Sequence, residues 1–195
     1  YLSWGTQFFD VDNDGDRDAF IASGHLESDV EIYENTTFAQ RNQLFLNDGS
    51  GRFEEIIPIQ GSALDERQVS RGAAFGDYDD DGDIDILVAN VSERPQLLRN
   101  DTAGAGHWLR LRLEGTRSNR SAIGARVTLK AGSQQASAEV ATGGSYLSQS
   151  DLRLHFGLGS ATVVDSVSVS WPSGVVQVLT HVAVDQQHVI REVGP

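Results

Sequence analysis

The chain of 195 residues carries a net charge of −13, which argues against a nucleic-acid backbone or an anionic membrane surface as a partner. Hydrophobic residues make up 39% of it, enough for one or two folded domains rather than a disordered acidic polymer. No apolar run approaches the length of a membrane span, and cysteine is absent, so no disulfide pattern indicates a compartment.

One stretch near the N-terminus occurs twice. WGTQFFDVDNDGDRDAFIA (4–22) returns as RGAAFGDYDDDGDIDILVA (71–89), and each copy is followed by a related piece, QLFLNDGSGRF (43–53) or QLLRNDTAG (96–104). Each copy reads as strand, acidic loop, strand, connection, strand and turn, with short β-branched runs and, in the first copy, an NDGSG hairpin signal. Repeats with several strands each predict propeller-blade-like units.

Both copies contain the loop pattern D-x-D-x-D-G-x-x-D. Two carboxylates about 4 Å apart repel by roughly 4 kcal/mol at an effective dielectric near 20, so a compact loop of this kind needs a cation. Ca²⁺ accepts about six to eight oxygens, and the glycine permits the sharp turn that closes the loop, whereas Mg²⁺ requires a stricter octahedron. We therefore predict two Ca²⁺ sites, with backbone carbonyls contributed at Asp16 and Asp83. Their residues are Asp10, Asp12, Asp14, Asp16 and Asp18 in the first loop and Asp77, Asp79, Asp81, Asp83 and Asp85 in the second.

The same acidic pattern could also be a solvated loop, an EF-hand or a dockerin. A solvated acidic loop is the simplest, but two copies in the same register argue against it. An EF-hand or a dockerin would place glutamate at the twelfth position and a helix after it, whereas Ile21 and Val88 stand there in apparent strands. The pattern therefore indicates an EF-hand-like loop on a β scaffold. Asp80, an additional acid in the second loop, is expected to point outward into solvent.

The two loops, the preceding FFD and FGD, and the LFLNDGSGRF turn resemble FG-GAP/VCBS repeats, the calcium-binding blades also found in integrin α-subunit propellers. This resemblance covers residues 4–104 and implies Ca²⁺ in each loop and a blade of antiparallel strands. Full propellers of this type have more blades than the two visible here.

After Thr102 the acidic loops end, and a small-residue linker (101–106) leads to stretches that alternate between apolar and polar residues. Period-2 alternation predicts an antiparallel two-sheet sandwich over 105–195. The fold class expected is therefore all-β, with two blade-like repeats in 1–104 (about 1–66 and 67–104) followed by this sandwich. The residues expected to share its inner faces are Leu109, Leu111 and Leu113; Ile123, Ala125, Val127 and Leu129; Leu152, Leu154, Phe156 and Leu158; and Val167, Val169 and Trp171.

This second half resembles the ASPIC/UnbV domain, which commonly follows VCBS repeats in secreted proteins. The matching pieces are HWLRLRLEGTRSNRSAIGARV (107–127), GGSYLSQSDLRLHFGLG (143–159) and VSWPSG (169–174). The resemblance implies a binding or structural module of extracellular proteins and supplies no activity.

No catalytic motif is complete, so we predict that the chain is not an enzyme. GGSYL (143–147) lacks the closing glycine of a nucleophile elbow, and GLGSAT (157–162) lacks the third glycine of a dinucleotide loop. The histidines are scattered, and His155 is expected to be an ordinary outward strand residue. Trp108 and Trp171 are expected in the sandwich core. The polar residues of 145–151 are more typical of a hydrogen-bonded surface loop than of a sugar-binding site.

Four N-x-S/T sequons are candidate glycosylation acceptors if the protein is secreted by a eukaryote or an archaeon. The absence of cysteine favours a prokaryotic source, where they would carry no meaning. The asparagines are Asn35, Asn90, Asn100 and Asn119.

We predict a secreted or cell-surface, calcium-stabilised structural or adhesion protein whose partners are other protein subunits, extracellular proteins or glycans. Two blades leave apolar faces and strand edges uncovered, so the chain is expected to be the tail of a longer propeller or to form homo-oligomers or filaments. Methionine is absent, which indicates a processed chain or a fragment. The alternatives are a carbohydrate- or protein-binding module at the C-terminal end of a larger propeller protein, and an enzyme fragment.

Overall fold

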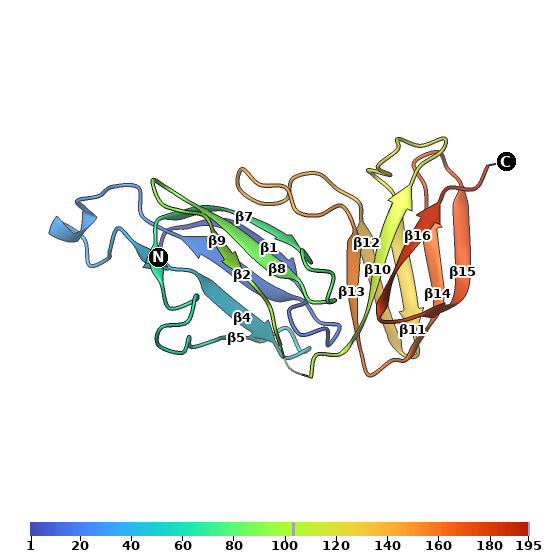
Figure 1. Ribbon diagram of the computed structural model, residues 1–195, viewed down its shortest axis with the longest axis horizontal. Coiled ribbons are helices and arrows are strands. Elements are labelled where there is room, and N and C mark those ends of the chain that lie inside the picture. The colour runs from blue at the N-terminus through green and yellow to red at the C-terminus, as the bar shows by residue number, and fades with distance from the viewer. Residues whose placement is uncertain (103, 195) are drawn as a thin grey trace.

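The computed structural model describes residues 1–102 and 104–194, and these ranges are built almost wholly from β-strands (Figure 1). Ala103 in the expected linker and Pro195 at the end of the expected sandwich lie outside them. The described residues include one 3₁₀ turn, η1 (Val30–Ile32), and no α-helix, and none of their helices has the length and apolarity to cross a membrane. The molecule is elongated, with the repeats at one end and the sandwich at the other. The expected all-β class is confirmed.

The first repeat forms a four-stranded antiparallel sheet in the order β1-β2-β4-β5. The first aspartate loop joins its two longest strands, and the NDGSG turn joins the last two. Alternate residues of β2 face inward, and Phe20 and Ala22 are fully buried because this face packs against the second repeat. The strands are β1 (Ser3–Phe9), β2 (Asp18–Ser23), β4 (Gln43–Asn47) and β5 (Phe53–Glu55).

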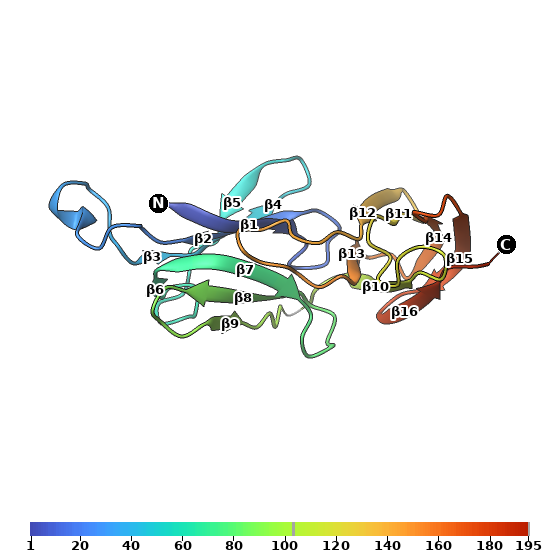
Figure 2. The ribbon, with the colours of Figure 1, turned by 90° about the horizontal axis from the view of Figure 1, so that it is seen from above.

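The second repeat forms a three-stranded antiparallel sheet in the order β7-β8-β9. β1 and β7 lie side by side, as Figure 2 shows, and a small β3-β6 ladder links the repeats. The phenylalanine rings of Phe9 and Phe20 pack on Phe75, with centroids 5.1 and 5.9 Å apart, so one apolar core serves both sheets. The strands are β3 (Gln40–Arg41), β6 (Arg67–Gln68), β7 (Ser70–Gly76), β8 (Asp85–Asn90) and β9 (Gln96–Leu98).

The sandwich consists of a three-stranded sheet, β13-β10-β16, and a four-stranded sheet, β12-β11-β14-β15. Its neighbouring strands are antiparallel except β10 and β16, which run parallel, a detail that an alternating pattern does not reveal. The strands are β10 (His107–Glu114), β11 (Arg126–Ala131), β12 (Gln134–Glu139), β13 (Leu154–Gly159), β14 (Val163–Ser170), β15 (Val176–Ala183) and β16 (Gln186–Arg191).

Most of the alternating residues expected inside the sandwich form its core. Leu109, Leu111 and the inward residues of β11 and β14 are fully buried, and each buried aliphatic side chain of this size contributes about 1.5–3 kcal/mol. Trp171 is buried with them, as expected. Ile123 is an exception, with 38% of its surface exposed, because it lies in the turn before β11 begins.

The outer face of the β13-β10 pair is covered by the repeats. Arg110, an outward residue of β10, is only 3% exposed. The connection between β12 and β13 also leaves the sandwich and lies along the repeats, since the amide of Asp151 donates to the carbonyl of Phe75 at 2.9 Å. Ser150 Oγ donates to Gln7 Oε1 at 2.8 Å, and Tyr146 packs on Trp4. The polar loop 145–151 is thus a structural connection between the two halves.

Candidate metal centre

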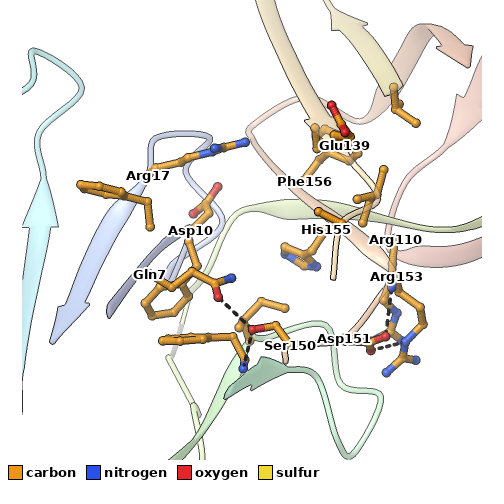
Figure 3. A pocket seen from close by; sticks show the side chains of 18 of the residues that line it. Gln7, Asp10, Arg17, Arg110, Glu139, Ser150, Asp151, Arg153, His155 and Phe156 are labelled. Atoms are coloured by element: carbon orange, nitrogen blue, oxygen red, sulfur yellow. Dashed lines mark hydrogen bonds and ion pairs between the residues drawn. The ribbon is translucent and has the colours of Figure 1, made fainter. Parts of the chain in front are cut away.

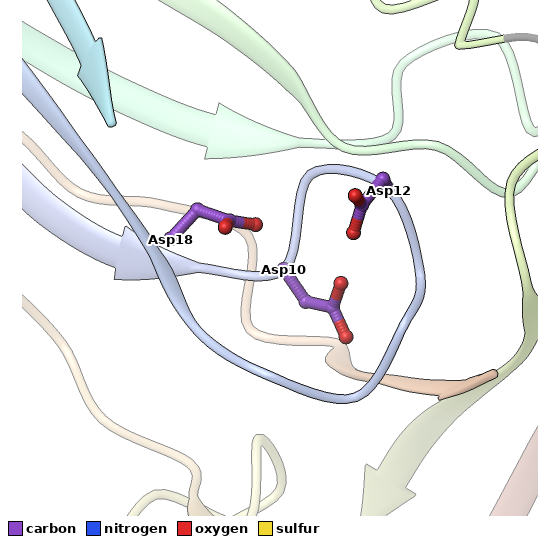
Figure 4. Close-up of side chains that lie close together, drawn as sticks. All are labelled: Asp10, Asp12 and Asp18. Atoms are coloured by element: carbon purple, nitrogen blue, oxygen red, sulfur yellow. The ribbon is translucent and has the colours of Figure 1, made fainter. Parts of the chain in front are cut away.

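The first aspartate loop brings three carboxylates together between β1 and β2. Asp10 follows the last residue of β1, Asp18 is the first residue of β2, and Asp12 lies between them, so the hairpin itself sets their positions. Each offers one carboxylate oxygen, and these oxygens lie within 4.8 Å of one another. Figure 4 shows the carboxylates of Asp10 and Asp12 inside the loop and that of Asp18, on the strand that leaves the loop, directed toward it.

The second loop repeats this arrangement between β7 and β8. Asp77, Asp79 and Asp85 again place one oxygen each within 4.8 Å of the others. Asp77 and Asp85 are buried, whereas Asp79 is exposed. The described residues therefore contain two acidic groups that could hold a metal ion, at equivalent positions of the two repeats.

Backbone amides orient the carboxylates in the same way in both loops. Asp10 accepts a hydrogen bond from the amide of Gly15 at 2.9 Å, and Asp77 accepts one from Gly82 at 2.8 Å. Both glycines have a φ near +100°, which an L-residue with a Cβ rarely adopts. Asp18 accepts a hydrogen bond from the amide of Val11 at 2.8 Å, and Asp85 accepts one from the amide of Tyr78 at 3.0 Å.

Sequence reasoning missed two asparagines that support these loops, Asn47 at the end of β4 and Asn100 just after β9. The amides of Asn47 and Asn100 donate to the second oxygen of Asp18 and Asp85, each at 2.9 Å. Each therefore fixes the last carboxylate of its loop. The signal was present in the sequence as the repeated Asn-Asp pair after QLFL and QLLR.

Four of the ten expected ligands lie outside the two groups of three carboxylates. Asp14 accepts a hydrogen bond from the amide of Asp16 at 2.8 Å, and Asp81 accepts one from Asp83 at 3.0 Å, so their side chains stabilise the turn of each loop. Asp83 also accepts from Asn13 Nδ2 at 2.9 Å. Direct coordination by these four residues stays a prediction.

The donor set fits a hard divalent cation. Oδ1 of Asp10, of Asp12 and of Asp77 are buried and have no hydrogen-bond partner, an arrangement that is costly for a charged group unless an ion meets it. Burial and the neighbouring aspartates raise the pKa of Asp10 to about 7 and that of Asp83 to about 6. Carboxylate oxygens that face one another in this way suit Ca²⁺.

The sandwich contacts the second loop through two arginines. Arg110 pairs with Asp77 and, at 2.9 Å, with Asp80, and Arg153 also reaches Asp80 at 2.9 Å. Hydrogen bonding to Arg153 and the charge of Arg110 lower the pKa of Asp80. Asp80 is exposed as expected, but the expectation that it is simply solvated is wrong, because β10 and the β12–β13 connection bring arginines to it.

The first loop meets the sandwich differently. His155 Nε2 lies 2.6 Å from Oδ1 of Asn13, a residue that is 1% exposed. Burial lowers the pKa of His155 to about 4, which favours the neutral ring. His155 does point outward from β13, but the first loop covers it. Trp108 also lies at this junction, stacked on His155 with a centroid distance of 6.1 Å, so its expected place in the sandwich core is wrong.

A cavity of about 720 Å³ lies between the two repeats and the sandwich. Figure 3 shows several of its lining side chains bonded to one another, including Ser150 to Gln7 and Arg153 to Asp151. Asp10 of the first loop forms part of its wall. Its lining is therefore continuous with the candidate metal centre.

The sequons occupy different surroundings. Asn35 is exposed. The side-chain amides of the other three donate to backbone carbonyls, at 3.0 Å from Asn90 to Arg94, 2.7 Å from Asn100 to Val11, and 2.8 Å from Asn119 to Ile123. Modification of any of them stays a prediction.

Comparison with known families agrees with this architecture. Residues 10–88 match the model of an FG-GAP-like repeat, and residues 115–194 match the model described as ASPIC and UnbV. The chain carries FG-GAP-like repeats followed by an ASPIC and UnbV domain. The resemblance inferred from the sequence is therefore confirmed. β10 precedes the matched range of the ASPIC and UnbV domain but lies between its strands β13 and β16.

Curated relatives align with most of this chain. Cartilage acidic protein 1 from Mus musculus and from Homo sapiens are each 30% identical to it over 169 residues, which cover 81% of this chain. The match covers 26% of the mouse protein and 25% of the human one. The Xenopus tropicalis protein is 33% identical over 125 residues, 62% of this chain and 19% of its own length. The chain thus spans about a quarter or less of the curated relatives it matches.

Proposed function

We propose that the chain is a non-enzymatic, calcium-binding structural or adhesion module, with one Ca²⁺ in each FG-GAP-like loop. The observation that carries this proposal is the pair of equivalent three-carboxylate groups, in which buried oxygens of Asp10, Asp12 and Asp77 have no hydrogen-bond partner. The ion neutralises the loops where they meet the ASPIC and UnbV domain. It therefore stabilises the hairpins of the two blades.

Calcium is expected to add to the stability of the folded state. An ion that binds only this state contributes about 2.7 kcal/mol per site at a free concentration of 100 times Kd. Calorimetric titration of the metal-free chain should give two ions bound, and thermal unfolding should shift upward by roughly 5–10 °C per filled site. The Asp12→Asn/Asp79→Asn double variant is the control, because it removes one carboxylate from each group. A chain that binds no Ca²⁺ at millimolar concentration would contradict the proposal.

An extracellular location follows from the same reasoning. The chain's relatives are named for cartilage, and oxygen-only sites of this kind suit the calcium concentration outside cells. Fractionation of producing cells, with detection of the chain in the medium or at the surface, tests this location. Recovery of the folded chain in the cytosolic fraction alone would contradict it.

Association with other protein subunits is the third part of the proposal. Ile32, Ile57 and Ile59 are each more than 80% exposed, and the second blade has three strands where the first has four. Apolar residues and a strand edge of this kind favour a homo-oligomer or filament. Light scattering in millimolar calcium and after chelation should show a large particle that becomes smaller without the ion. A monomer at high concentration under both conditions would exclude self-assembly.

We propose no catalytic role for the cavity, because its polar side chains already bond one another across the junction. Ser150 bonds Gln7, and Arg153 bonds Asp151. Hydrolysis of simple ester or glycoside substrates that disappears in the Ser150→Ala variant would contradict this part of the proposal.

A further inference from the structure

The two metal loops differ in the fixed positive charges around them. Among residues 1–102 and 104–194, no lysine, arginine or histidine forms an ion pair with Asp10, Asp12 or Asp18. In the second loop, two members of the corresponding group have such partners. Asp77 pairs with Arg110, and Asp79 lies 3.9 Å from Arg99.

Arg110 is held in place and cannot leave the second loop easily. It projects from β10, a strand whose other face forms the core of the ASPIC and UnbV domain, and its side chain is 4% exposed. One terminal nitrogen contacts Asp77 and the other Asp80, while the ring of Trp108 lies 5.3 Å from the guanidinium. A guanidinium confined by two carboxylates and an aromatic ring acts as a permanent charge at this place.

In the part of the chain that the structure describes, the corresponding position of the first loop has no such charge. The Asp10 carboxylate faces the backbone of β13 at Gly157, where an added Cβ would overlap it. Its Oδ2 accepts a hydrogen bond from the amide of Gly15 and none from an arginine among the described residues. The first loop therefore serves as the reference for calcium binding by the shared loop geometry without a neighbouring arginine.

We propose that Arg110 is a resident counter-ion of the second loop, which makes the two calcium sites unequal. The first loop binds Ca²⁺ more tightly, and the second binds it more weakly because the ion and Arg110 share Asp77 and repel each other. Binding free energies are reciprocal, so an ion in the second loop weakens the contact between Arg110 and Asp77. This inference rests on the calcium function proposed above.

A purely orienting role for Arg110 would have the opposite consequence, because a well-placed ligand binds a metal more tightly. The amide of Gly82 already holds the same Asp77 oxygen, as Gly15 holds Asp10 in the first loop. Orientation is therefore supplied in both loops without an arginine. What Arg110 adds to the second loop is charge.

Single-site variants separate the two affinities. Asp12 and Asp79 occupy equivalent positions, so Asp79→Asn leaves the first site and Asp12→Asn leaves the second. Calorimetric titration with Ca²⁺ should give a Kd at least about tenfold lower for the Asp79→Asn chain. Equal affinities, or tighter binding at the second site, would overturn the inference. Failure of the unaltered chain to bind Ca²⁺ would instead refute the proposed function.

The arginine itself is tested in the Asp12→Asn background. Arg110→Met should lower the Kd of the second site about tenfold, whereas Arg112→Met, on the same strand but 59% exposed, should leave it unchanged. Unchanged or weaker binding in Arg110→Met would overturn the inference. If Arg110→Met does not fold, Arg99→Gln replaces it, because that side chain is 53% exposed. A roughly two- to threefold tighter second site is then expected, and no change would count against the inference.

Discussion

The two aspartate loops have the same backbone but different surroundings. Gly15 and Gly82 have φ values of 100° and 102°, and the fourth residues, Asn13 and Asp80, have 59° and 62°. The two loops differ in sequence at this fourth position. Asn13 faces a neutral histidine and the other loop, whereas Asp80 faces two arginines. A sequence repeat thus preserves local conformation, while a domain that follows it makes the two copies chemically different.

The largest expected difference concerns the first carboxylate of each loop in metal-free protein. Asp77→Asn should lower the free energy of unfolding by about 3–5 kcal/mol, because it removes the buried charged partner of Arg110 and leaves it only the exposed Asp80. Asp10→Asn should change it by less than about 1 kcal/mol or raise it, because no cationic side chain within residues 1–102 and 104–194 pairs with Asp10. Urea unfolding in excess chelator measures both values. Similar losses in the two variants would show that Arg110 does not distinguish the loops.

Replacing the loop glycines Gly15 and Gly82 should also cost more stability in the second loop than in the first, but the difference should be smaller. A Cβ at either position is strained by the positive φ, at a cost of roughly 1–3 kcal/mol. At Gly82 it would also overlap the ring of Trp108, whereas at Gly15 it would meet the flexible end of Gln134. Gly82→Ala should therefore destabilise the chain by roughly 1 kcal/mol more than Gly15→Ala in the same urea experiment. A larger loss at Gly15 would contradict this account of the junction.

Much of this arrangement is accessible from the sequence. The duplicated loop pattern identified both three-carboxylate groups, because the ligands of one loop are close in sequence and the hairpin alone brings them together. Alternation predicted the core of the ASPIC and UnbV domain, since a strand with one buried face repeats every second residue. Leu109 and Leu111 are fully buried, as that pattern requires.

The junction could not be predicted in this way. Alternation shows that Arg110 points away from Leu109 and Leu111, but it does not show what covers that outer face. Arg110 is buried because a loop 33 residues away in sequence packs on it, and the same long-range contact places Trp108 outside the core. The parallel pairing of β10 and β16 is likewise a property of the topology, not of local pattern.

The metal-free chain should lose stability as pH rises, because of the first loop. Burial, with repulsion from the neighbouring aspartates, raises the pKa of Asp10 from 3.8 to about 7 in the folded state. The folded chain then holds a proton that the unfolded chain releases, so this contribution is complete below about pH 4 and is lost as pH approaches 7. We expect a decrease of about 1–2 kcal/mol between roughly pH 5 and 7.5 in chelator. Asp10→Asn should reduce it, and an unchanged slope would contradict the assignment.

Asp80 should show the smallest effect and the opposite pH dependence. Its pKa is lowered by the hydrogen bond from Arg153 and by Arg110, so its contribution is present above its usual pKa of 3.8 and is lost as pH falls through the lowered value. Because its side chain is 68% exposed, Asp80→Asn should cost much less than Asp77→Asn, and high salt should reduce the difference further. Urea unfolding at low and at high ionic strength measures this. A loss of stability that salt does not reduce would mean that the Asp80 carboxylate acts as part of the buried Arg110–Asp77 pair. The two loops would then differ in charge at Asp80 as well as at their first carboxylates.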